Sequence, residues 1–65
     1  MPMLINKTVK LDLSKIDGNA YALLGAFQAA ARRSGWSAQE IEAVQQEATS
    51  ADYNNLVATL LKYTV

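Results

Sequence analysis

Hydrophobic and polar residues alternate near the amino-terminal end of the sequence. From Lys7 to Leu13, apolar residues occupy every second position, with Val9 and Leu11 preceding Leu13, and polar residues fill the positions between them. This period of two predicts a strand with one buried face. A lone strand needs hydrogen-bonding partners, so it must pair with a second copy, with another protein or with the strand-like residues 63–65. We favour antiparallel pairing of two copies through Lys7, Val9, Leu11 and Leu13.

The rest of the chain follows a helical period. Apolar residues recur at three- and four-residue spacing in three segments, which predicts helices over residues 20–33, 38–48 and 53–62. The residues expected to face the core are Ala20, Leu23, Leu24, Phe27, Ala31, Ile41, Val44, Ala48, Tyr53, Leu56, Val57, Leu60 and Leu61. Glycine inside a helix costs about 1 kcal/mol against alanine, so close packing against another element is the expected reason for Gly25.

The ends of these helices carry clear signals. Ser37 and Glu40 form the pattern of a capping box, and Trp36 and Ile41 can pack across the same turn as a hydrophobic staple. Gly35 suits the left-handed position that ends a helix. The candidate caps of the other two helices are Asp17 or Asn19, and Ser50 or Asp52.

These elements together predict a single domain of residues 1–65 with an α+β fold. One amino-terminal strand precedes a three-helix bundle, and the apolar face of the strand lies on the helices. Trp36, at the corner between the first two helices, is the expected anchor of the core.

Composition limits the chemistry that the chain can perform. It contains neither cysteine nor histidine, which removes thiolate chemistry, the commonest general base and the commonest metal ligand. The serines lie at turns or caps, where backbone hydrogen bonding explains them. We therefore expect no enzymatic activity, no cofactor and no metal site. No apolar run approaches a membrane span or a signal peptide, so a cytoplasmic protein without membrane contact is expected.

Charge is zero overall but unevenly spread. Residues 1–35 hold five basic and two acidic residues, and residues 36–65 hold one basic and four acidic residues. The acidic residues could meet a basic groove on a partner, although solvated helix faces commonly carry such charges. The candidate partner-binding residues are Glu40, Glu42, Glu47, Asp52, Arg32 and Arg33.

The first two helices and their short turn have the outline of a helix-turn-helix. The segment that would enter the major groove, residues 38–48, carries three glutamates and neither lysine nor arginine, so phosphate groups would repel it. Nucleic acid is therefore not the expected partner. A dimeric nucleic-acid-associated regulator that uses Arg32, Arg33 and the strand lysines remains the alternative function.

Several short motifs resemble a family of small proteins from bacteria and their phages or mobile elements. The matching residues are Ile16-Asp17-Gly18-Asn19-Ala20, Gly25-Ala26-Phe27, Ala31-Arg32, Gly35-Trp36, Glu40-Ile41 and Asp52-Tyr53. Tyr21 stands where the family often has phenylalanine, and Ala51 where it often has glycine. The family carries no established activity. Its context implies a role in host takeover or in countering host defence, as small phage inhibitors of CRISPR systems do.

We expect a small non-enzymatic interaction module that forms a homodimer and blocks a host protein by stoichiometric occlusion, in the host cytoplasm if a phage encodes it. The acidic surface or the open strand edge would make the contact.

The capping box gives a first test. Replacing Ser37 with alanine removes the side-chain acceptor at the start of the second helix, so the free energy of unfolding should fall by about 1 kcal/mol. Urea denaturation measures this change, and an unmoved midpoint would count against the capping box.

Overall fold

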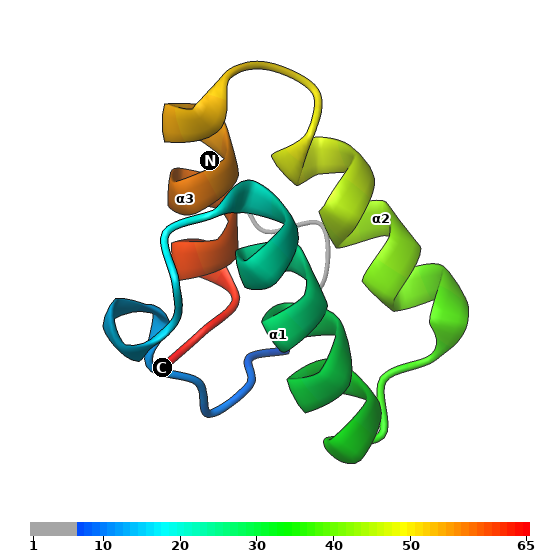
Figure 1. The fold of residues 1–65 in the computed structure, drawn as a ribbon. Helices are drawn as coiled ribbons and strands as arrows, with labels where there is room; N and C mark the ends of the chain where they lie inside the picture. Colours follow the sequence, from blue (N-terminus) through cyan, green and yellow to red (C-terminus); the bar gives the residue numbers. More distant parts are fainter. Residues whose placement is uncertain (1–6) are drawn as a thin grey trace.

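The computed structural model describes residues 7–65, so the first six residues of the expected domain lie outside the described range. A one-turn 3-10 helix, η1 (Leu13–Lys15), precedes three α-helices: α1 (Ala20–Arg33), α2 (Ala38–Ala48) and α3 (Tyr53–Lys62). Each helix packs against the other two, and Figure 1 shows α1 lying across the pair formed by α2 and α3. The three predicted helices are confirmed at their predicted bounds.

The helix starts are capped by the residue types that the sequence indicated. The Asn19 side chain accepts the N–H of Tyr21 at 2.8 Å, and Asp52 accepts the N–H of Asn55 at 2.9 Å. Of each pair of candidate caps, the residue adjoining the helix therefore fills the role. The capping box of α2 is present, because Ser37 and Glu40 each accept the other's backbone N–H.

Gly35 ends the turn between α1 and α2. Its φ of 86° lies in the left-handed region, where a Cβ atom would be strained. The N–H of the next residue, Trp36, bonds to the carbonyl of Ala31 at 3.0 Å, which closes the end of α1 as a glycine-terminated helix requires.

The core lies between the three helices and is organised around an aromatic row. Trp36 meets Phe27 edge-to-face with ring centroids 5.6 Å apart, and it meets Tyr63 in the same manner at 6.2 Å. The expectation that Trp36 anchors the core is confirmed. The buried apolar residues are Val9, Leu23, Phe27, Ala30, Ala31, Trp36, Ile41, Val44, Ala48, Leu56, Leu60 and Tyr63.

The predicted strand over residues 7–13 is wrong, and residues 7–65 form a small compact all-α domain rather than an α+β fold. Val9 makes a single parallel bridge with Thr64. The N–H of Val9 donates to the carbonyl of Tyr63 at 2.8 Å, and the carbonyl of Val9 accepts the N–H of Val65 at 2.9 Å. The segment before Leu13 therefore has hydrogen-bonding partners in its own chain. At Leu13 the backbone enters the 3-10 helix η1 and does not continue as an extended strand.

This pairing removes the reason for which the sequence predicted an antiparallel strand dimer. The partner of the bridge is the short carboxyl-terminal segment 63–65, which was the one alternative within the chain. The expected apolar strand face also breaks up: Val9 is buried in the core, whereas Leu11 and Leu13 are only half-buried.

Two of the residues expected in the core of α3 are exposed. Tyr53 is 48% exposed and Leu61 is 58% exposed. Tyr53 instead donates its phenolic hydroxyl to the carbonyl of Gly18 at 2.5 Å, which ties the start of α3 to the turn before α1. Thr59 takes an inward position beside Leu60. In the described part of the chain, no helix is long and apolar enough to cross a membrane.

The buried position of Val9 gives a second test. A Val9→Asp substitution places a carboxylate in the apolar core, so the free energy of unfolding should fall by about 3 kcal/mol or more. The neighbouring Thr8 is exposed, and Thr8→Asp serves as the matched control with an expected change below about 0.5 kcal/mol. Chemical denaturation of both variants measures the difference. Equal losses would show that Val9 is not a core residue.

Candidate functional site

Glu40, one of the predicted partner-binding acids, is engaged within the molecule. Its carboxylate lies 2.8 Å from the ammonium of Lys7 and accepts the backbone N–H of Ser37, also at 2.8 Å. The Lys7 ammonium, followed by the Ser37 N–H, holds the pKa of the Glu40 carboxyl below its usual value of 4.5. Lys7, which was expected in a dimer strand, therefore fixes the amino-terminal segment to the start of α2.

The other three predicted acids have different surroundings. Glu47 forms an ion pair with Lys62 across α2 and α3, and its carboxylate raises the pKa of that lysine. Asp52 caps α3. Glu42 is exposed and accepts a hydrogen bond from the Gln46 side chain at 3.3 Å. Two of the four acids are thus neutralised by lysines and a third serves a cap, which leaves a weaker acidic surface than the sequence indicated.

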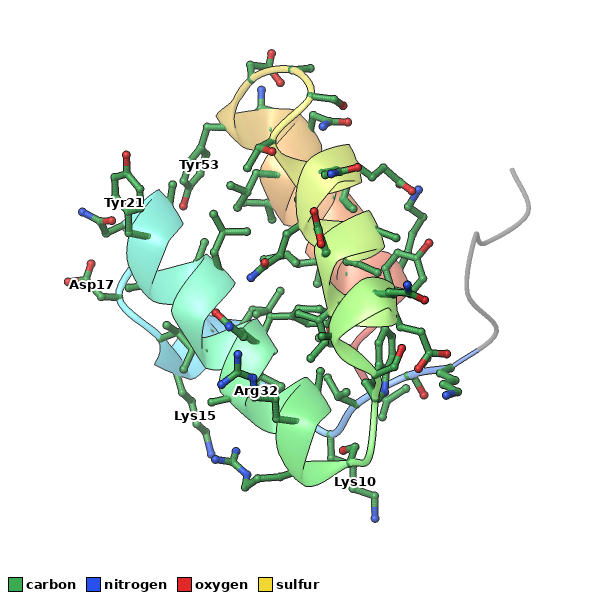
Figure 2. The ribbon with its side chains drawn as sticks, turned by 90° about the vertical axis from the view of Figure 1, so that its right-hand side faces the viewer. Lys10, Lys15, Asp17, Tyr21, Arg32 and Tyr53 are labelled. Carbon is green, nitrogen blue, oxygen red and sulfur yellow. The ribbon has the colours of Figure 1, made fainter. Side chains whose placement is uncertain are left out.

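Apart from Lys7, the cations of the first half have no such partners within residues 7–65. Among residues 7–65, no ion pair involves the four exposed residues Lys10, Lys15, Arg32 and Arg33. Figure 2 shows Arg32 toward the carboxyl-terminal end of α1, and Lys10 and Lys15 come from the segment that precedes this helix. We call these four residues the basic end of α1. The two arginines also suit the negative end of the helix dipole.

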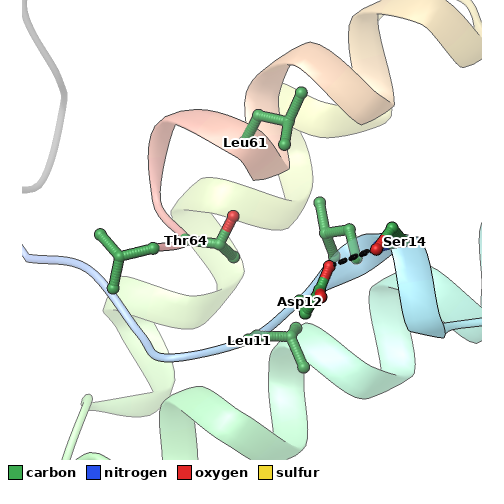
Figure 3. A pocket seen from close by; sticks show the side chains of 7 residues that line it. Leu11, Asp12, Ser14, Leu61 and Thr64 are labelled. Carbon is green, nitrogen blue, oxygen red and sulfur yellow. Dashed lines mark hydrogen bonds between the residues drawn. The ribbon is translucent and has the colours of Figure 1, made fainter.

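An apolar pocket of about 390 Å³ lies beside the bridge between Val9 and Thr64. Leu61 reaches it from the last turn of α3, and Leu11 and Asp12 lie opposite, on the segment that leads into η1 (Figure 3). Asp12 accepts hydrogen bonds from the N–H and hydroxyl of Ser14, which fixes its carboxylate at the pocket. The lining residues are Leu11, Asp12, Leu13, Ser14, Leu61, Thr64 and Val65.

Large apolar side chains at this pocket are open to solvent. Leu61 is 58% exposed and Val65 is 73% exposed, and Leu11 and Leu13 are half-buried beside them. The sequence did not reveal this site, because helical spacing assigned Leu61 to the core and the alternation assigned Leu11 and Leu13 to a strand face. The pocket lining comes from two segments that lie far apart in the sequence, residues 11–14 and residues 61–65.

The described residues offer no centre for metal chemistry. Among residues 7–65 there is no group of three or more acidic, histidine or cysteine side chains that could hold a metal ion. The expected lack of enzymatic activity stays a prediction.

Comparison with known proteins adds no relative: no protein-family model, no curated protein and no solved structure matches this chain. The resemblance to small phage and mobile-element proteins therefore stays an expectation based on its motifs.

The Lys7–Glu40 pair gives a third test. Because the folded-state pKa of Glu40 is lowered, its charged form contributes stability above pH 4.5, and this contribution is lost as the pH falls through the folded-state value. Lys7→Gln removes the main cause of the shift. The wild-type protein should therefore be more stable than this variant at neutral pH, and the difference should shrink in acid.

Denaturation across the acidic range measures this difference. Lys10→Gln is the matched control, because Lys10 is exposed and makes no ion pair within residues 7–65. A difference between the wild type and Lys7→Gln that stays constant with pH would contradict the assignment.

Proposed function

We propose that the protein is a non-enzymatic protein-binding module. Its pocket beside the Val9–Thr64 bridge would receive an apolar side chain of the partner. The observation that carries this proposal is the exposure of Leu61 and Val65 around a hollow of about 390 Å³. Contiguous exposed apolar surface is unfavourable in water and marks interaction sites in soluble proteins. Full burial of one leucine side chain contributes about 1.5–3 kcal/mol, so a single inserted side chain can anchor a complex.

The charged residue at the pocket indicates which residue types a partner would present. Asp12 is the one charged residue among the lining residues, and its carboxylate is held in place by Ser14. A partner segment with an aliphatic or aromatic residue next to a lysine or arginine would fill the hollow and pair with Asp12. The acids that the sequence offered as the binding surface contribute less, since Glu40 and Glu47 already have lysine partners.

Occlusion is the mechanism that such a site supports. The module binds at a fixed stoichiometry and covers the surface that its partner uses, without bond-making chemistry. The motif resemblance to phage and mobile-element proteins favours a host protein, including a defence protein, as that partner, and the host cytoplasm as the place of action.

A charge at the pocket tests this function. Leu61→Asp removes the exposed apolar side chain and adds a second carboxylate, so the affinity for the partner should fall by about tenfold or more. The partner is first captured from a lysate of the native host and identified by mass spectrometry, and binding of the purified proteins is then measured by calorimetry. Gln39→Asp, at an exposed position of α2 away from the pocket lining, is the matched control. Equal affinities of the two variants would refute the pocket as the binding site.

A second candidate function rests on the basic end of α1. Its four exposed cations make no ion pair within residues 7–65, and exposed cations can contact phosphate groups. This observation favours the alternative of a dimeric nucleic-acid-associated regulator. A salt-sensitive gel shift by the purified protein, in the absence of any protein partner, would support this alternative over the occluding module.

A further inference from the structure

The solvent face of α1 has an unusual composition for an exposed helix. From Ala20 to Ala31 the sequence contains no charged residue, although α1 lies at the surface for its whole length. Tyr21 on this face is 85% exposed, the highest value among the large hydrophobic side chains of the described residues. Surface helices of monomeric proteins normally carry charges on the side facing water. The face therefore has the character of a contact surface.

Gly25 lies on the same face, one helical turn after Tyr21, and the fold does not explain it. The sequence predicted close packing there, but Gly25 is exposed, and a Cβ atom built on it would meet nothing within 4 Å. Its φ is not in the left-handed region, so the backbone does not require glycine either. Glycine weakens a helix relative to alanine. A close approach from outside the folded chain would account for this residue.

Opposite charges stand at the two ends of this face. Asp17 precedes the amino-terminal end of α1, and Arg32 and Arg33 close its carboxyl-terminal end. Figure 2 shows Asp17 and Tyr21 near one end of the helix, and Arg32 toward the other. Arg33 lies eight residues after Gly25, about 12 Å along the helix axis, and Asp17 lies eight residues before Gly25, outside the first turn of the helix. The face is therefore complementary in charge to its own copy in the reverse direction.

We propose that a second copy of the chain covers this face, with the two α1 helices antiparallel and crossing at Gly25. A two-fold axis at Gly25 brings the arginines at the carboxyl-terminal end of each α1 toward Asp17 at the amino-terminal end of the other, and it covers Tyr21 with the small side chain of Ala29. In this arrangement the two helix dipoles are antiparallel, which is electrostatically favourable. This dimer differs from the strand dimer that the sequence predicted, because it leaves the Val9–Thr64 bridge inside each copy.

A second copy is the occupant because the symmetry of the charges makes the face self-complementary. An unrelated partner would need no such arrangement. One helix pair is a small interface beside the roughly 800 Å² per partner of a standard one, so we expect reversible association that depends on concentration. The proposal does not depend on the pocket, since none of the pocket-lining residues belongs to α1.

Sedimentation equilibrium over a series of concentrations tests the dimer. The wild-type chain should associate reversibly, and Gly25→Leu should sediment as a monomer because the leucine side chains collide at the crossing point. This substitution raises helix propensity, so circular dichroism of dilute samples should show no loss of helix and unfolding cannot explain the change. Ala58→Leu adds the same side chain at an exposed position of α3 and should leave association unchanged.

The charge pairing has its own readout. Arg33→Glu should weaken the association constant about tenfold or more and should reduce its dependence on salt. A wild-type chain that stays monomeric at its highest soluble concentration would overturn the proposal. A dimer that Gly25→Leu leaves intact would overturn it as well, and so would one that Arg33→Glu leaves intact.

Discussion

Val9 donates its backbone N–H to the carbonyl of Tyr63 and accepts the N–H of Val65, and this pairing joins segments from opposite ends of the sequence. The same short segment 63–65 places the Tyr63 ring against Trp36, which in turn meets Phe27 of α1. One backbone contact and one aromatic row therefore connect both ends of the described chain to the helices. In a chain of this length each such contact matters, because a small domain buries a modest share of its surface.

The surface of the molecule follows from this arrangement. With Val9 in the core, Lys7 comes within reach of Glu40, and α3 brings Lys62 to Glu47, so two of the four acids of the second half are neutralised within the molecule. The bridge also leaves Leu61 and Val65 outside the core, where they border the pocket. The pocket and the solvent face of α1 both present side chains that the core leaves exposed, among them Leu61, Val65 and Tyr21.

Local signals in the sequence predicted the helices correctly. The pairing of segments far apart in the sequence could not be predicted from such signals. The bounds of α1, α2 and α3, the capping box at Ser37 and the left-handed Gly35 depend on residues close together in the chain. The conformation of residues 7–13 depends on pairing with a segment near the other end of the sequence. The alternation at Val9, Leu11 and Leu13 does not indicate which segment that is. The same limit hid the pocket, because its lining combines residues 11–14 with residues of segment 61–65, at the other end of the sequence.

The aromatic row has a practical consequence for experiments in solution. Trp36 is the only tryptophan of the chain, and it is buried where the turn between α1 and α2 meets Tyr63. Its indole emission should shift to longer wavelength when water reaches this junction. The protein therefore carries an intrinsic optical probe that reports, without any added dye, whether its carboxyl-terminal segment is docked on the helices.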